Sequence, residues 1–404
     1  ESIVKDGEVY YHSRLYDRAR NRMVKSLRLQ TVTRPPESYA SLMAGRIELH
    51  APAEEQLKRA MEQCCDINLP VRQWESVIFR RRVKNYSETM LDRLLAQGDY
   101  FWKMAPDGNL SFHRYDDIDW GAGLPEAAEE LEGDELLLYR ELKRRGASFL
   151  KFLTGIPKED SAQEVLLKLA AKGLVCADSF VPVRQRVNAR VMALSAGRWD
   201  IVRPVREKSR EELLLRYFTE AVVLCRETFL KASMGDEFTW REALEILRVW
   251  EYTGRVRRGY FIEGLSGAQF IRKDDYEAVT ALLQKSDEEL IWMNASDPAQ
   301  IWGKILKQPK EREFMNLPGT AVALLGGLPA AVLEKQGKTL RVFGDDAQSR
   351  LDIILSGLVR DFREKKLFAD QKRLIVKDYP KYAGDSLKKA GFIHEMQDYV
   401  LYWP

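Results

Sequence analysis

The sequence is poor in the residues that build metal sites, disulfides and membrane spans. Its 404 residues include only four cysteines and four histidines. The cysteines show no CxxC spacing and the histidines no spacing of helical metal ligands, so neither a disulfide framework nor a metal site is expected. No apolar run approaches the roughly 20 residues that a bilayer crossing needs, so we expect no membrane partner.

Two motifs of ATP-driven motors are also missing. There is no GxxxxGK[ST] phosphate loop and no DEAH-like pair of carboxylates to hold magnesium, so we expect no cofactor in this chain. The chain begins without Met and lacks the apolar core of a signal peptide. We therefore expect a cytoplasmic fragment of a longer protein.

The composition is that of an ordinary globular chain of two to four domains, with 45% hydrophobic and 31% charged residues. The net charge of +3 is small, but its distribution is uneven. Residues 184–273 hold 18 Lys and Arg against 12 Asp and Glu. A basic segment with aromatic residues is typical of a loop that follows phosphates, and a soluble linker is the alternative interpretation.

The centre of this basic segment, Thr253 to Phe270, reads TGRVRRGYFIEGLSGAQF. Arginines and aromatic residues alternate with smaller ones, as in strands, and Gly264 and Gly267 permit a tight return. A cationic hairpin behind a helix predicts a wing, whose arginines lie along phosphates while an aromatic ring stacks on an unpaired base. The alternative is a solvated edge hairpin whose arginines prevent aggregation.

An irregular repeat organises the first two thirds of the chain. Three amphipathic helices each end at a glycine, Gly98, Gly173 or Gly254, and a short strand follows each of them. A helical segment precedes each of these units, and helix, helix, glycine and hairpin is the order of a winged helix. In the first unit, the residues Pro106 to Asn109 are a strong turn signal, so we predict that the first wing closes there. Ser161 and Thr239 stand where an N-cap belongs, three residues before a glutamate, so we predict capping boxes there.

The pattern changes after about residue 286, where short apolar segments separated by glycine-rich turns predict antiparallel strands with two packed helices. The predicted fold class is α+β: tandem winged-helix domains followed by a β-barrel module with packed helices. The predicted domains are a helical segment with the first winged helix (1–125), a second winged helix with a basic linker (126–205), a third winged helix with the basic wing (206–286) and the β-barrel module (287–404).

Six motifs, taken in order along nearly all of the chain, resemble the C-terminal region of the large helicase-related (Lhr) proteins. They are LYDRARNRMVKSLR, LPVRQWESVIFRRRVKNYSETMLDRLLAQGDYFW, ELKRRGASF, LAAKGLVCADSFVPVR, GRVRRGYFIEGLSGAQF and NASDPAQIWG. The resemblance implies a superfamily 2 DNA helicase whose C-terminal half has an architecture similar to that of the AlkZ-type DNA glycosylases. It also implies a helicase core upstream, which alone would need ATP and Mg²⁺.

On this interpretation the chain binds single-stranded or duplex DNA for a DNA repair helicase, in association with the nucleoid. Three consecutive arginines at 80–82 cannot all face one core, so at least one should reach solvent or a phosphate. The predicted contacts are Arg80, Arg81, Arg82, Arg184, Arg186, Arg190, Arg255, Arg257, Arg258, Tyr260 and Phe261.

Two other functions stay open at this point. Base excision needs a carboxylate or an amide beside a flipped nucleotide, and Asp297 and Gln269 are the candidate catalytic residues. Asp297 precedes a proline, which is also a common turn arrangement. A third interpretation makes the region a scaffold for homo-oligomers, with the aromatic-rich barrel as its interface.

Overall fold

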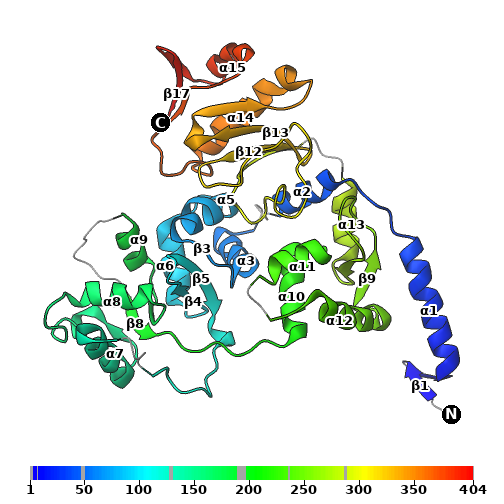
Figure 1. Ribbon diagram of the computed structural model, residues 1–404, viewed down its shortest axis with the longest axis horizontal. Helices are drawn as coiled ribbons and strands as arrows, with labels where there is room; N and C mark the ends of the chain where they lie inside the picture. Colours follow the sequence, from blue (N-terminus) through cyan, green and yellow to red (C-terminus); the bar gives the residue numbers. More distant parts are fainter. Residues whose placement is uncertain are drawn as a thin grey trace. The chain divides into compact units, whose positions relative to one another are not determined.

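The computed structural model describes residues 3–6, 8–46, 51–126, 131–188, 197–234, 237–285 and 289–403. The chain forms two compact units (Figure 1). Unit 1 consists of residues 1–46, 208–363 and 371–404, and unit 2 consists of residues 47–207 and 364–370. Unit 2 is therefore inserted in the sequence of unit 1.

Unit 2 contains two small antiparallel sheets, with strand orders β3-β5-β4 and β6-β8-β7, and the helices that cover them. Its elements are α3 (Ala53–Cys64), β3 (Leu69–Pro70), α4 (Val71–Gln73), the π-helix Trp74–Phe79, α5 (Arg80–Arg82), α6 (Glu88–Ala96), β4 (Tyr100–Met104), β5 (Asn109–Arg114), α7 (Gly133–Arg145), β6 (Ser148–Phe149), α8 (Ala162–Ala171), β7 (Val175–Ala177), α9 (Val181–Asn188) and β8 (Arg198–Ile201).

The predicted first wing is present as the β4–β5 hairpin, which turns at Asp107 and Gly108. Asp107 accepts hydrogen bonds from the backbone and side chain of Asn109, and Gly108 has a φ of +83°. One continuous hydrophobic core joins both halves of unit 2, and the indoles of Trp102 and Trp199 meet edge to face within it.

Unit 1 contains the third winged helix, the C-terminal sheets and the N-terminal helices. Its elements are β1 (Ile3–Asp6), β2 (Val9–His12), α1 (Ser13–Leu29), α2 (Pro36–Gly45), α10 (Arg210–Ala221), α11 (Arg226–Ala232), α12 (Trp240–Thr253), β9 (Val256–Gly259), β10 (Gln269–Arg272), α13 (Tyr276–Gln284), β11 (Leu290–Asn294), β12 (Ala321–Leu325), β13 (Leu328–Glu334), β14 (Thr339–Val342), α14 (Ala347–Arg363), β15 (Arg373–Val376), α15 (Gly384–Lys389), β16 (Ile393–Glu395) and β17 (Asp398–Tyr402).

The third winged helix has the predicted order of helices and hairpin. Helices α10, α11 and α12 pack around a core that includes Leu214, Phe229 and Leu247, and β9 pairs antiparallel with β10 behind them. Thr239 and Glu242 form the predicted capping box at the start of α12, and Gly254 ends the helix in the left-handed conformation. The predicted capping box of Ser161 is also present, in unit 2.

The described residues of the C-terminal region form two antiparallel sheets with packed helices. Their strand orders are β11-β12-β13-β14 and β15-β17-β16. Helix α14 packs against β11, and the indole of Trp292 on β11 donates to the carbonyl oxygen of Ile354 on α14 at 2.8 Å. The described strands form no closed barrel, so the predicted β-barrel is not confirmed, whereas the mixed α and β composition is.

Candidate nucleic-acid interface

The wing of the third winged helix holds its arginines against aromatic rings. The guanidinium carbon of Arg255 lies 4.1 Å from the ring centre of Trp250, that of Arg257 lies 4.4 Å from Tyr276, and that of Arg258 lies 6.0 Å from Phe270. Stacking on a ring face fixes a guanidinium while its N–H groups stay available at the edge. The wing therefore presents cations that are both positioned and able to bind an anion.

These wing arginines are almost free of acidic partners. Arg255 forms an ion pair with Glu211 at 3.1 Å, and both side chains are about half exposed, at 49% and 56%. Exposed pairs of this kind contribute about 0 to 1 kcal/mol and are weakened by salt, so Glu211 can be displaced. Across the described parts of the chain, Arg257 and Arg258 form no ion pair.

The two aromatic residues after β9 have opposite surroundings. Tyr260 is 60% exposed, whereas Phe261 is 1% exposed and packs against the ring of Tyr276 in the core of unit 1. Of this pair, only the Tyr260 ring lies on the surface where it could stack on a base. We therefore leave Phe261 out of the candidate interface.

Helix α12 contributes cations that were not among the residues predicted from sequence. Its buried face carries Ala243, Leu247 and Trp250, and its outer face exposes Arg241 and Arg248. Neither arginine forms an ion pair with a described residue, although Glu245 lies exposed between them. The sequence could have indicated this exposed face, because helical periodicity places residues 241, 245 and 248 opposite the apolar positions.

The N-terminal helix α1 is attached to the C-terminal end of α12 and to β9. The Arg28 guanidinium donates to both carboxylate oxygens of Glu251 at 2.6 and 2.7 Å, and Glu251 is 6% exposed. This charge-assisted bond raises the pKa of Arg28. Arg20 Nε donates to the carbonyl oxygen of Tyr252 at 2.6 Å, and the Tyr252 hydroxyl donates to Asp17.

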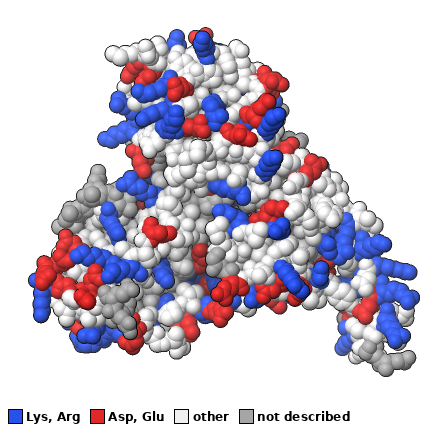
Figure 2. Space-filling view, in the orientation of Figure 1, with Lys and Arg blue, Asp and Glu red and all other residues white. Residues whose placement is uncertain are grey.

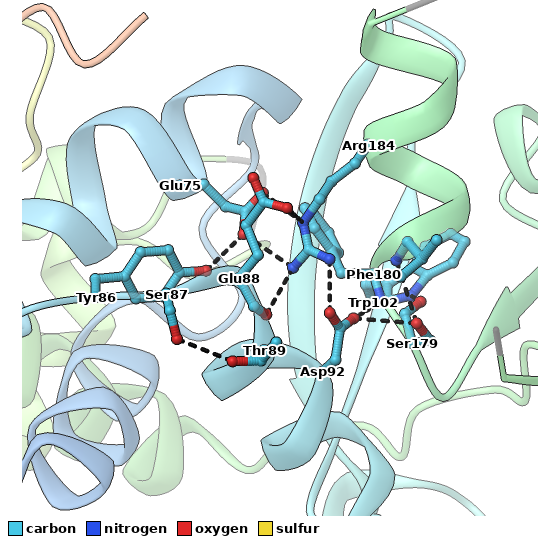
Figure 3. A network of polar contacts seen from close by, with 11 residues as sticks. Glu75, Tyr86, Ser87, Glu88, Thr89, Asp92, Trp102, Ser179, Phe180 and Arg184 are labelled. Carbon is cyan, nitrogen blue, oxygen red and sulfur yellow. Dashed lines mark hydrogen bonds and ion pairs between the residues drawn. The ribbon is translucent and has the colours of Figure 1, made fainter. Parts of the chain in front are cut away.

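Arg184, in contrast, is enclosed by carboxylates of unit 2 (Figure 3). Its guanidinium donates to Glu75 at 2.8 and 3.0 Å and to Asp92 at 2.6 Å, and only 10% of its side chain is exposed. Desolvation opposes its charge, but the bonds to Glu75 and Asp92 prevail and raise the pKa of Arg184. The Tyr86 hydroxyl donates to Glu75 at 2.6 Å, which completes the network.

A cavity of about 90 Å³ beside this network has a mixed lining. Its charged residues are Arg72, Arg80, Arg184, Glu75, Glu88 and Asp370. Three carboxylates among three guanidinium groups leave no net positive charge to attract a phosphate. The structure thus places Arg184 inside a network in which carboxylates neutralise its charge.

The remaining predicted cations of unit 2 are dispersed. Arg80 is partly exposed and lies 5.9 Å from the ring centre of Tyr86, whereas Arg81 and Arg82 are each only 5% exposed. Arg186 is exposed and donates to the carbonyl oxygen of Leu167. Arg190 lies outside the described residues.

The predicted catalytic amide is a buried structural group. The side chain of Gln269 is fully buried, accepts hydrogen bonds from the backbone N–H groups of Phe261 and Ile262, both at 2.8 Å, and donates to the carbonyl oxygen of Ile262. It therefore fixes the loop that joins β9 to β10. In this position its amide has no free donor or acceptor directed at solvent.

The predicted catalytic carboxylate, Asp297, is also fully buried, and its Oδ1 accepts from the backbone N–H of Ala299 at 2.8 Å. Lys304 lies beside it and donates from Nζ to the backbone oxygen of Asp297 at 2.8 Å. Desolvation lowers the pKa of Lys304 to about 8, although Asp297 acts to raise it. Among the described residues there is no cluster of metal-ligand side chains, and no described helix could span a membrane.

Comparisons with known proteins identify two winged-helix regions in the chain. Residues 35–114 and residues 205–291 each match a winged-helix domain of the large helicase-related protein. The chain is 27% identical to a Lhr helicase/probable uracil glycosylase of Mycolicibacterium smegmatis and 25% identical to a Lhr helicase/uracil glycosylase of Escherichia coli K12, over 85% and 88% of its length. It spans 26% of the length of either relative.

Among solved structures, the chain is similar to the DNA glycosylase AlkZ of Streptomyces sahachiroi. The TM-score is 0.47 at 12% identity, and the likeness covers 81% of this chain and 97% of the glycosylase.

Proposed function

We propose that the chain is the DNA-binding, C-terminal part of an Lhr-type DNA repair helicase. The two matches to winged-helix domains of the large helicase-related protein and the similarity to two Lhr relatives support this proposal. The helicase core of such a protein would lie upstream and would carry out the chemistry that requires ATP and Mg²⁺. The protein would act on DNA in the cytoplasm, at the nucleoid.

A single observation carries the proposal, namely the set of stacked and largely unneutralised arginines on the β9–β10 wing. In a winged helix, α12 corresponds to the recognition helix, and the wing lies along the neighbouring backbone. Arg241 and Arg248 would contact the groove or its edges, while Arg255, Arg257 and Arg258 would bind phosphates and Tyr260 would stack on an unpaired base.

The test is a titration of labelled single-stranded and duplex DNA at two salt concentrations. We expect the variant with Arg255, Arg257 and Arg258 changed to Ala to bind more than about tenfold more weakly at 0.1 M salt, because each lost phosphate contact removes a counterion-release contribution. The matched control changes Lys372, Arg373 and Lys381 to Ala, three exposed cations of the same unit. Equal affinity of the two variants for DNA would show that the wing arginines do not contact DNA.

A second candidate function is base excision, which the loop around Asp297 favours. Lys304 keeps a largely desolvated amine that donates to the backbone oxygen of Asp297, and both relatives carry the word glycosylase in their names. An amine with a lowered pKa can serve as a base or nucleophile near neutral pH. Uracil-containing or alkylated DNA would be incubated with the chain and cleaved with alkali at abasic sites. No product above that of the Asp297→Ala and Lys304→Gln variants would remove this candidate.

A further inference from the structure

We propose that helix α1 is a second phosphate-binding element, whose outer face binds the backbone of the DNA held by the third winged helix. This inference rests on the proposed function and extends it to a segment that no winged-helix match includes, since the matches begin at residues 35 and 205. It is carried by the division of α1 into two faces of different chemistry.

The inner face of α1 is half-buried and packs on α12 and β9. It presents Tyr16, Arg20, Val24 and Leu27, spaced by three and four residues. Two arginines of α1 bond to α12. The guanidinium of Arg20 donates to the Tyr252 carbonyl oxygen, and that of Arg28 donates to Glu251. The inner face therefore accounts for two of the helix's six cations.

The outer face carries the other four cations, and all four are exposed. Its cationic stripe consists of Arg14, Arg18, Arg22 and Lys25. Within the described ranges no carboxylate forms an ion pair with any of the four. The one acid of the helix, Asp17, accepts the Tyr252 hydroxyl, and Asp6 accepts the Tyr16 hydroxyl at 3.1 Å. Figure 2 shows Lys and Arg side chains gathered over this helix.

The attachment of α1 fixes the helix that carries the stripe beside the candidate interface. Helix α1 lies against the strand that carries Arg257 and Arg258 and against the end of the recognition helix (Figure 1). Thr33 Oγ1 donates to the Tyr260 carbonyl oxygen at 2.7 Å, and Arg34 exchanges backbone hydrogen bonds with Phe261 and Glu263. The segment that follows α1 is thus bonded to the loop that joins β9 to β10.

The spacing of the stripe suits a nucleic-acid backbone. Arg14, Arg18 and Arg22 are separated by one helical turn, or about 6 Å. A duplex carries a phosphate about every 3.4 Å of axis on each strand, so adjacent arginines can reach phosphates about two nucleotides apart. Arginine also binds phosphate oxygens in a bidentate manner, and three of the four cations are arginine. The stripe should therefore make three or four phosphate contacts.

The experiment measures how duplex affinity depends on salt. A labelled 20-base-pair duplex is titrated with the full chain and with the variant R14Q/R18Q/R22Q/K25Q between about 0.05 and 0.3 M salt. A slope of about 0.9 per phosphate contact means that the variant should lose about 3 from the slope of log K against log salt. Its affinity at 0.1 M salt should fall more than about tenfold.

The matched control, K372Q/R373Q/K381Q/K388Q, removes the same charge from exposed positions of unit 1 at which no described residue forms an ion pair. The control should keep the wild-type slope. A stripe variant that behaves like the control, while the wing variant still loses affinity, overturns the role of α1 alone. A wild-type chain that binds no DNA overturns the proposed function as well. If the stripe variant changes only the mass measured by light scattering, the stripe binds a second copy of the chain, and the inference is wrong.

Discussion

Two arginine-rich parts of the molecule, the segment around Arg184 and the wing around Arg257, are similar in sequence and different in structure. Arg184 is 10% exposed and bonded to two carboxylates, whereas Arg255 is 49% exposed and the wing arginines lie on aromatic rings. The first arginine joins parts of its own unit. The second set is available to a partner.

The difference shows what a charge count along the sequence leaves out. The acids that neutralise Arg184 lie 109 and 92 positions away, at Glu75 and Asp92. Only the fold brings these acids to Arg184. The surplus of positive charge in residues 184–273 therefore did not reveal that Arg184 is neutralised. The rings beneath the wing are local by comparison, because Trp250 and Phe270 lie within the same helix and hairpin.

The largest effect is expected from a substitution that breaks the Arg184 network. Arg184→Met leaves Glu75 and Asp92 without their cation, and removing one partner of a buried ion pair costs several kcal/mol, so we expect a loss of about 3 kcal/mol in the stability of unit 2. Arg186→Met, on the same helix but exposed, should change stability by less than about 0.5 kcal/mol. Urea unfolding followed by circular dichroism measures both. Retained stability with a loss of DNA affinity would make the network a binding site.

Lys304 is a third kind of cation to compare with Arg184 and the wing arginines, because it is buried and donates to a carbonyl oxygen. Burial lowers its pKa from 10.5 to about 8, so folding is opposed while the amine is charged in both states. That cost is fully present below pH 8 and is relieved as the pH rises toward 10.5, where stability should increase by up to about 3 kcal/mol. Lys304→Met should lack this increase. Parallel urea midpoints of both proteins between pH 7 and pH 10 would contradict the prediction.

A smaller effect is expected on the recognition helix. Changing Arg241 and Arg248 to Gln should weaken duplex binding about tenfold, because both are exposed and neither is neutralised by a described residue. The stability of unit 1 should not change measurably, since neither side chain is buried. Fluorescence anisotropy with Glu245→Gln as the partner variant tests the assignment, because removing that carboxylate should strengthen binding. If the Glu245→Gln variant also loses affinity, charge is not the reason that the Arg241 and Arg248 variant binds DNA more weakly.

The smallest effect concerns the one acid paired with the wing. Glu211→Gln releases Arg255 from its exposed ion pair, and we expect DNA to bind about two- to threefold more tightly at low salt. Such a pair contributes less than about 1 kcal/mol, so the stability of unit 1 should be nearly unchanged. The gain should vanish above roughly 0.3 M salt, where exposed charges are screened. A gain independent of salt would have another origin.

Local features of the fold could be predicted from the sequence. The capping boxes of Ser161 and Thr239, the left-handed Gly254 and the turn at Asp107 and Gly108 each depend on residues within a few positions of one another. The same holds for the wing, whose two strands are separated by nine residues. These elements have strong local causes, and the structure confirms them.

Features that depend on distant contacts could not be predicted. The helical segment before the third unit is divided into α10 and α11, because α10 ends at Val222, which has a φ of +64°. The attachment of α1 to α12 joins Arg28 to a glutamate 223 positions away. Gln269 illustrates the same limit for the site, since an amide that serves a loop cannot be distinguished in the sequence from one that serves a substrate.

The insertion of unit 2 into unit 1 has a consequence for how the chain acquires its structure. Unit 2 is nearly continuous, whereas unit 1 must bring together residues 1–46, 208–363 and 371–404. Closing so long a loop costs entropy before any contact compensates it, and folding slows as contacts become more remote. In the full chain, pulsed hydrogen exchange should therefore protect the amides of β4 and β5 before those that join Arg34 to Phe261, so the surface assigned to DNA would be the last to mature.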